Sequence, residues 1–127
     1  MSDEKSLIRK KLIYKRKKLF NKKYNFLFKN IINFINKEFK SKKKINIGLY
    51  YPTNFEVNVF SFFKNVKKKK YILSLPMVLE NYQMTFKKWK PNQSLYLNRY
   101  GIPEPHINNS TIKPDIILVP LVGYDKK

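Results

Sequence analysis

The chain lacks cysteine altogether, and it has a single histidine and three glycines among its 127 residues. Without cysteine it can carry no thiol nucleophile, no disulfide scaffold and no cysteine-ligated zinc. One histidine gives little support to a histidine-rich metal site or to a histidine-based catalytic dyad. The glycines, Gly48, Gly101 and Gly123, form neither a GxGxxG motif nor a P-loop. A complete site for the phosphates of ATP therefore cannot be assembled from this sequence alone.

A hydrophobic leader and long apolar runs are also missing. The first residues, MSDEKS, are charged and no apolar run follows them, so we expect no secretory signal. The longest apolar stretch, residues 116–124, is too short to cross a bilayer. Hydrophobic residues still make up 43% of the chain, which is enough for a core. We therefore expect one soluble, cytoplasmic domain.

Acidic residues are scarce: 8 of them face 28 lysines and arginines, which gives a net charge of +20. One interpretation is a protein that binds the phosphate backbone of nucleic acid. The other is the composition of an AT-rich genome, in which Lys, Asn, Ile, Tyr and Phe are enriched together. Only three basic residues are arginine, on which sequence-reading proteins depend most. A small basic protein that binds nucleic acid or other anions without catalysis is therefore the less favoured alternative.

Helical patterns dominate the first 40 residues, which contain no proline. Asp3 and Glu4 favour a helix start, and Asn21 is expected to break the helix. A second helix is predicted by apolar residues that recur every three or four positions: Tyr24, Phe28, Ile31, Ile35 and Phe39. Strands are predicted at 45–51 and 71–75, ended by Pro52 and Pro76, and at 84–86. A helix capped by Thr53 or Asn54 would carry the apolar residues Val59, Phe60, Phe62, Phe63 and Val66.

The other elements are expected to be arranged around residues 113–125 (KPDIILVPLVGYD). Residues 116–119 are apolar in succession, which is typical of a central strand buried on both faces, and Pro120 should end it. A strand, a helix, a strand and a return to another buried strand predict an α/β protein with a three-layer, Rossmann-like open sheet. Residues 1–40 would supply N-terminal helices, and residues 45–127 the sheet with its crossover helices.

Glu56 is the most suggestive acidic residue, because it follows the first predicted strand at the edge where open α/β sheets bind ligands. Its carboxylate could accept hydrogen bonds from an N–H-rich ligand edge, or it could merely complement a helix N-terminus. Position alone favours the second. Lys5 and Arg9 lie four apart on a helix and could clamp phosphates, although basic residues occur throughout this segment. The remaining candidates are interpreted as turn, cap, loop or core residues: Asp115, Asp125, His106 and Trp89.

Five motifs, in order along essentially the whole chain, resemble those of the 5-formyltetrahydrofolate cyclo-ligase family, also called methenyltetrahydrofolate synthetase. They are KSLIRKK at 5–11, YYPTNFEV at 50–57, LP at 75–76 with MTF at 84–86, GIPEP at 101–105, and DIILVPLVGYD at 115–125. Each motif alone is of low specificity, whereas five at the expected spacing are fairly specific.

The resemblance implies conversion of 5-formyltetrahydrofolate to 5,10-methenyltetrahydrofolate with ATP and Mg²⁺. It implies a monomer that binds neither membranes nor nucleic acid. Glu56 would hold the folate, and Tyr51 would line the same pocket. The residues implied to contact ATP are consecutive: Lys5, Ser6, Leu7, Ile8 and Arg9. It assigns no catalytic residue and no metal ligand within this chain.

The chain departs from the family pattern after Asp125. There the family carries a glycine-rich R-x-G-x-G-x-G-Y-Y-D stretch that holds ATP, and this sequence has no counterpart. We therefore expect an incomplete domain, truncated at its C-terminal end, with weak or no catalysis by itself. We also expect an exposed apolar sheet edge, because the central strand would lack neighbours.

Overall fold

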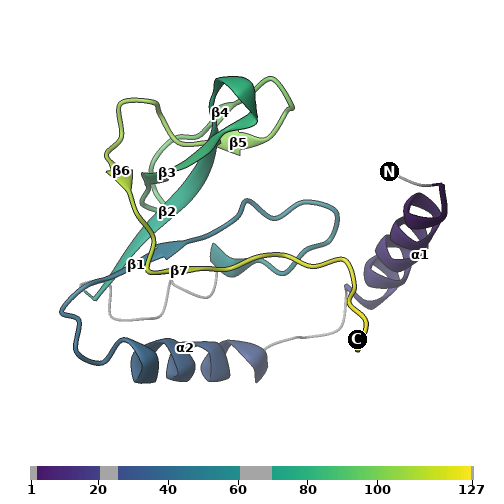
Figure 1. The fold of residues 1–127 in the computed structure, drawn as a ribbon, viewed down its shortest axis with the longest axis horizontal. Helices are drawn as coiled ribbons and strands as arrows, with labels where there is room; N and C mark the ends of the chain where they lie inside the picture. Colours follow the sequence, from purple (N-terminus) through teal and green to yellow (C-terminus); the bar gives the residue numbers. More distant parts are fainter. Residues whose placement is uncertain (1–2, 21–25, 61–69, 127) are drawn as a thin grey trace.

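The computed structural model describes residues 3–20, 26–60 and 70–126. Within them, helices α1 (Asp3–Leu19) and α2 (Phe26–Glu38) come first and short strands follow (Figure 1). The strands are β1 (Ile45–Gly48), β2 (Tyr71–Val78), β3 (Met84–Lys88), β4 (Tyr96–Leu97), β5 (Pro103–Glu104), β6 (Thr111–Ile112) and β7 (Ile116–Ile117). A 3-10 turn, η1 (Glu80–Tyr82), joins β2 to β3. No helix in this part of the chain is long and apolar enough to cross a membrane.

Five strands form one open sheet in the order β6-β3-β2-β1-β7. β1 pairs in parallel with both β2 and β7, whereas the β2–β3 and β3–β6 pairs are antiparallel. Parallel neighbours require a crossover connection, and the connection from β1 to β2 includes residues 61–69, which lie outside the described residues. β4 and β5 form a separate hairpin. The predicted α/β class with an open sheet is confirmed.

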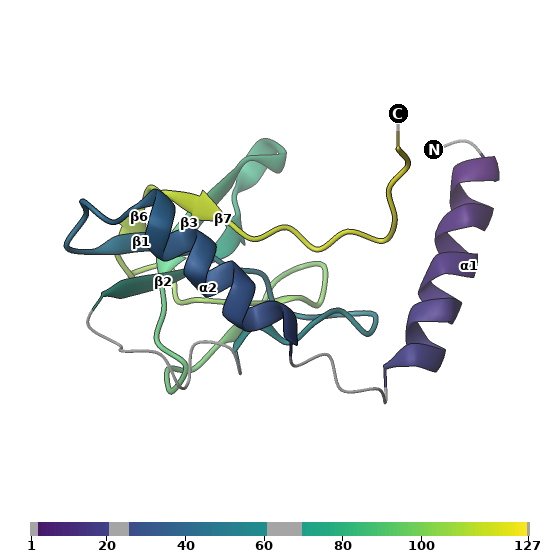
Figure 2. The same cartoon turned by 90° about the horizontal axis from the view of Figure 1, so that it is seen from below.

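α2 covers one face of the sheet (Figure 2). Its apolar residues recur at helical spacing, so they lie on one side of the helix, and this side packs against the core. Ile35 is fully buried, and Phe28, Ile31 and Phe39 pack beside the core. The predicted apolar helix face is therefore confirmed over these residues. The break expected at Asn21 and the side chain of residue 24 lie outside the described residues. The buried cluster consists of Ile35, Ile45, Ile47, Leu49, Val59, Tyr71, Leu75 and Trp89.

A strand is present within the predicted range 116–119, but it is shorter than predicted and is not central among the described residues. β7 comprises Ile116 and Ile117 alone and pairs only with β1, so it lies at the edge of the sheet formed by the described residues. Leu118 N still donates to Gly48 O over 2.9 Å, but Ile117 and Val119 are 48% and 66% exposed. The continuous apolar run therefore indicated a strand but not its place in the sheet. The exposed apolar edge that we expected is present here.

β2 runs through Pro76, where we predicted it to end. Pro76 lies opposite Phe86 of β3. Leu79 N donates to Gln83 O. Because only alternate residues of a strand direct their N–H and C=O groups to a given neighbour, the odd-numbered residues of β2 form the hydrogen bonds with β3. The nitrogen of Pro76 consequently faces the side of β1, and β1 has already ended opposite Ser74. No ladder hydrogen bond is lost there, so proline is tolerated.

The helix that we expected to be capped by Thr53 or Asn54 begins later. Residues 59 and 60 are helical, and Asn58 Oδ1 accepts a hydrogen bond from Phe60 N at 3.0 Å. Asn58 is therefore the cap, because this is the contact of an N-cap oxygen with the second helical N–H. The apolar residues predicted at 62, 63 and 66 lie outside the described residues.

Candidate functional site

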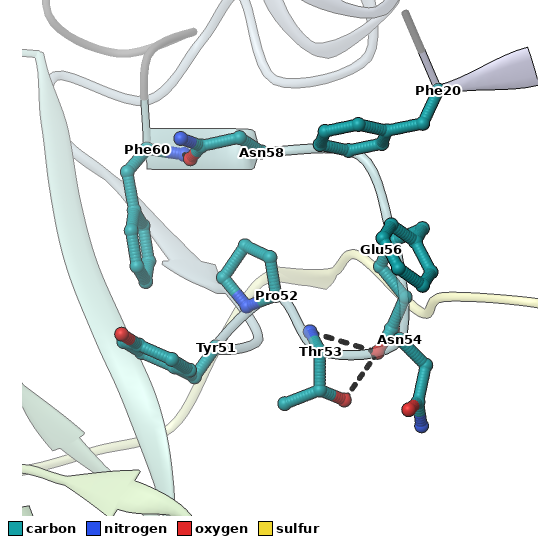
Figure 3. A pocket seen from close by; sticks show the side chains of 9 residues that line it. Phe20, Tyr51, Pro52, Thr53, Asn54, Glu56, Asn58 and Phe60 are labelled. Atoms are coloured by element: carbon teal, nitrogen blue, oxygen red, sulfur yellow. Dashed lines mark hydrogen bonds between the residues drawn. The ribbon is translucent and has the colours of Figure 1, made fainter. Parts of the chain in front are cut away.

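A pocket of about 350 Å³ opens where the chain leaves the carboxyl end of β1 (Figure 3). The loop of residues 51–58 provides most of its wall, and Phe20, which follows α1, and Phe60 complete it. The lining residues are Phe20, Tyr51, Pro52, Thr53, Asn54, Phe55, Glu56, Asn58 and Phe60. The carboxyl edge of parallel strands is the usual ligand-binding edge of an open α/β sheet. The structure thus brings together the two residues predicted to bind the substrate, Tyr51 and Glu56.

The pocket loop is shaped by a tight turn between Thr53 and Glu56. Asn54 and Phe55 adopt left-handed backbone conformations with φ of 49° and 63°, which costs about 1 kcal/mol or more for each non-glycine residue. Glu56 N donates to Thr53 O over 3.0 Å. In return, Glu56 Oε1 accepts hydrogen bonds from Thr53 N at 3.1 Å and from Thr53 Oγ1 at 2.7 Å (Figure 3). These bonds hold a conformation that the residues in it would not favour alone.

Glu56 thus differs from the helix-capping carboxylate that was the more favoured interpretation of its position. It bonds to the turn and not to a helix N-terminus, and only its Oε1 atom takes part. Within the described residues, Oε2 accepts no hydrogen bond. This leaves one oxygen of the carboxylate able to accept an N–H group of a ligand.

Aromatic rings form the apolar part of the pocket. The ring centroids of Tyr51 and Phe60 lie 5.7 Å apart, and Phe60 in turn packs on the buried Trp89 at 5.0 Å. On the other side, Phe20 and Phe55 meet edge to face at 5.4 Å. Flat apolar walls beside a carboxylate suit a planar heteroaromatic ring that carries N–H donors.

Tyr50 and Arg16 lie behind the loop. Tyr50 is half-buried and its hydroxyl donates to Val57 O at 2.8 Å. Burial and the nearby Glu56 carboxylate raise the pKa of Tyr50 to about 12, against a smaller opposing effect of Arg16. Tyr50 therefore stays a neutral hydrogen-bond donor at ordinary pH and supports the loop. Arg16 Nη1 donates to Leu121 O at 3.3 Å, which joins α1 to the segment after β7.

The residues predicted to contact ATP do not line this pocket. Lys5, Ser6, Leu7, Ile8 and Arg9 occupy the first half of α1, and α1 has no buried residue. Figure 2 shows α1 standing beside the sheet, with the last residues of the chain running along it. The structure therefore places the predicted ATP-contacting residues and the predicted folate-contacting residues on two different elements.

Sequence reasoning missed several lining residues. Thr53 had a signal, because Thr and Glu at a T-x-x-E spacing often exchange hydrogen bonds. Phe20 had none, since it ends a lysine-rich helix and meets the pocket only through the tertiary fold. Asn58 was missed because the helix cap was assigned to Thr53 or Asn54.

The other chemistry-bearing residues have structural roles. His106 Nδ1 accepts from Asn108 N at 3.0 Å, and its ring packs against Tyr96. Trp89 is buried, and its Nε1 donates to Gln93 O at 3.2 Å. No group of three or more acidic or histidine side chains that could hold a metal ion gathers among residues 3–20, 26–60 and 70–126.

Asp115 fastens β7 to β1. One carboxylate oxygen accepts from Asn46 N at 2.8 Å, and the other forms an ion pair with Lys42. Asp115 N also donates to Asn46 O at 2.7 Å. The hydrogen bond from Lys42, followed by the one from Asn46, holds the pKa of Asp115 below its ordinary value. Asp115 therefore joins two neighbouring strands, a role that differs from the cap or turn suggested by its place after Pro114.

The stability of the protein is expected to fall in acid partly through Asp115. Because the pKa of this group is lower in the folded than in the unfolded state, its contribution is complete above the unfolded-state pKa of about 3.9. The contribution is lost as pH falls below that value toward the folded-state pKa. Urea unfolding at pH 7 and pH 3.5 should show a smaller pH-dependent loss for Asp115→Asn than for the native protein. Glu80→Gln, which removes an exposed carboxylate, is the control. If it reduced the pH-dependent loss of stability as much as Asp115→Asn does, the loss could not be assigned to Asp115.

An open sheet of parallel and antiparallel strands with a pocket at the carboxyl end of β1 defines the chain as an α/β protein. No protein-family model matches it. A curated 5-formyltetrahydrofolate cyclo-ligase from Haemophilus influenzae is 27% identical over 88 residues, which cover 65% of this chain and 47% of that protein. The chain therefore spans about half the length of the curated relative it matches.

Solved structures agree with this comparison. The solution structure of the Aquifex aeolicus 5,10-methenyltetrahydrofolate synthetase matches 95% of this chain and 62% of its own, with a TM-score of 0.70 and 29% identity. A Mycoplasma pneumoniae 5,10-methenyltetrahydrofolate synthetase matches 98% of this chain and 68% of its own, with a TM-score of 0.55. At 22% identity the second likeness concerns the fold alone. The resemblance to the 5-formyltetrahydrofolate cyclo-ligase family, which five sequence motifs predicted, is confirmed.

Proposed function

We propose that the chain forms a folate- and ATP-binding part of a 5-formyltetrahydrofolate cyclo-ligase. The observation that carries this proposal is the pocket shared by Tyr51 and Glu56 at the carboxyl end of β1. These are the two residues that the sequence resemblance assigns to the folate. The similarity to proteins named 5-formyltetrahydrofolate cyclo-ligase and 5,10-methenyltetrahydrofolate synthetase supports the same assignment.

The pocket suits the ring system of a folate. A tetrahydropterin ring is flat on its pyrimidine side and carries N–H donors along one edge. Glu56 would accept hydrogen bonds from that edge, and a bond to a charged acceptor is stronger than a neutral one. Tyr51 and Phe60 would pack against the ring and exclude water from it. The Thr53 hydrogen bonds keep the Glu56 side chain in place before the ligand arrives.

ATP would bind through the first half of α1. Lys5 and Arg9 are exposed cations four residues apart, so both can face one polyphosphate. When bound, ATP would supply the phosphoryl group that activates the formyl oxygen of the folate. Mg²⁺ is normally held by one or two carboxylates together with substrate phosphates. The described residues fit such a phosphate-held ion better than a dedicated protein cage.

Calorimetric titration of the full chain with 5-formyltetrahydrofolate, and separately with MgATP, tests the proposal. We expect saturable binding of both ligands, with folate affinity little affected between 50 and 200 mM salt. The double variant Lys5→Ala, Arg9→Ala should weaken MgATP binding by roughly tenfold or more, because it removes charged hydrogen bonds, and should leave folate binding alone unchanged.

Single-stranded RNA serves as the competing ligand, since the net charge of +20 would also suit a polyanion. Binding of RNA whose affinity falls steeply with salt, together with no saturable folate binding, would favour the anion-binding alternative over the cyclo-ligase.

A further inference from the structure

Phe20 brings α1 into the wall of the pocket. It directly follows the last residue of α1 and lines the pocket together with the loop of residues 51–58. Its ring meets that of Phe55 edge to face at 5.4 Å, and Lys17 Nζ lies 5.7 Å from the centroid of the Phe55 ring. Phe20 is still 51% exposed. A ligand in the pocket can therefore contact it and cover more of it.

The rest of α1 is attached through few contacts. No residue of α1 is buried. Besides the contacts with Phe55, Arg16 bonds to Leu121 O, and Leu12 lies against Gly123, where an added Cβ would come within 2.5 Å of Leu12 Cδ1. An element with little buried apolar area has a low local stability. A ligand that touches α1 can therefore shift the balance between its docked and undocked positions.

We propose that Phe20 is a ligand-contacting residue that couples the pocket to the cationic first half of α1. A planar heteroaromatic ligand in the pocket packs against Phe20 and favours the docked position of α1. In that position Lys5 and Arg9 are held at a fixed distance from the pocket, which organises them for a polyphosphate. The inference rests on the proposed function, because it takes the folate as the pocket ligand and MgATP as the polyphosphate.

The coupling must be reciprocal. If a bound folate raises the affinity for MgATP, bound MgATP raises the affinity for folate by the same factor. We expect a factor of about five or more, which lies at the low end of typical couplings between sites. Removing the Phe20 ring should abolish the coupling without removing either binding site.

The experiment measures the dissociation constant of 5-formyltetrahydrofolate with and without saturating MgATP, on the full chain. The native protein should bind the folate at least about fivefold more tightly when MgATP is present. In Phe20→Ala the ratio of the two constants should fall to about one. Tyr14→Ala is the matched control, because Tyr14 is an exposed aromatic of the same helix that packs with Lys18 and does not line the pocket. It should keep the native ratio.

The results distinguish a failure of the proposed coupling through Phe20 from a failure of the proposed function. Loss of coupling in Phe20→Ala with native coupling in Tyr14→Ala supports the inference. If the native protein binds both ligands independently, or if Phe20→Ala keeps the native ratio, the inference is overturned and the proposed function stands. If the native protein binds no folate, both are overturned.

Discussion

Replacement of Glu56 by alanine is expected to weaken 5-formyltetrahydrofolate binding by about 10- to 150-fold, the equivalent of the roughly 1.5–3 kcal/mol typical of a hydrogen bond to a charged group. The variant loses the acceptor for the N–H edge of the ligand. It also loses the hydrogen bonds from Thr53 that hold the left-handed turn. Both losses lower the affinity, and calorimetric titration of the native and variant proteins measures their sum.

Two further variants separate the effect of the ligand contact from that of the loop. Glu56→Gln keeps the shape and one acceptor oxygen for Thr53 but presents an NH₂ group toward ligand donors, so its affinity should fall nearly as far as that of Glu56→Ala. Thr53→Val keeps the carboxylate and removes only the hydroxyl that donates to it. Because a single hydrogen bond from a neutral donor is lost, we expect the folate affinity to fall by about threefold to tenfold. Native affinity in Glu56→Gln would show that Glu56 serves the turn alone.

Trp89→Ala should cause the largest loss of stability, about 3–5 kcal/mol. The Trp89 side chain is only 4% exposed and belongs to the buried cluster that joins α2 to the sheet. Its removal leaves a cavity under Phe60, which packs on it at 5.0 Å. A domain with a typical stability of about 5–15 kcal/mol would lose a large part of it. Urea unfolding followed by circular dichroism measures the change.

A smaller aromatic tests whether the volume of Trp89 or its indole N–H matters more. Trp89→Phe retains most of the packing and loses the bond to Gln93 O, so we expect a cost of about 1–2 kcal/mol. Tyr124→Ala, at an exposed position, should change stability by no more than about 0.5 kcal/mol. A cost for Trp89→Ala as small as that for Tyr124→Ala would contradict the role of Trp89 in the core.

Local patterns predicted the elements well. The spacing of Phe28, Ile31 and Ile35 predicted the apolar face of α2, because helical periodicity depends only on neighbours within two turns. Apolar patterns likewise located the first residues of β1, β2 and β3, but the prolines did not mark where β1 and β2 end, at Gly48 and Val78. Glu56 was found because a residue that follows a buried strand is fixed at one edge of the sheet.

Features decided by neighbouring strands could not be predicted in the same way. Pro76 looked like a strand end, yet it is tolerated because β1 stops before reaching it. Ile116 and Ile117 looked like a central strand, yet their position depends on which strands pair beside them. Phe20 became a pocket residue only through a contact with Phe55 from a distant part of the chain. Sequence spacing carries no information on such contacts.

The attachment of α1 has a consequence for the order of events during synthesis. α1 leaves the ribosome before the other described elements. Yet Arg16 bonds to Leu121, 105 positions later, and Leu12 rests on Gly123. These partners do not yet exist while residues 3–120 are being synthesised. Contacts between residues far apart in the sequence form late, because closing a long disordered loop costs conformational entropy. Folding of the intervening residues shortens that loop and lowers the cost. The sheet of the described residues can therefore form before α1 has these partners, and the lysine-rich helix lacks them until residues 121–123 have been synthesised.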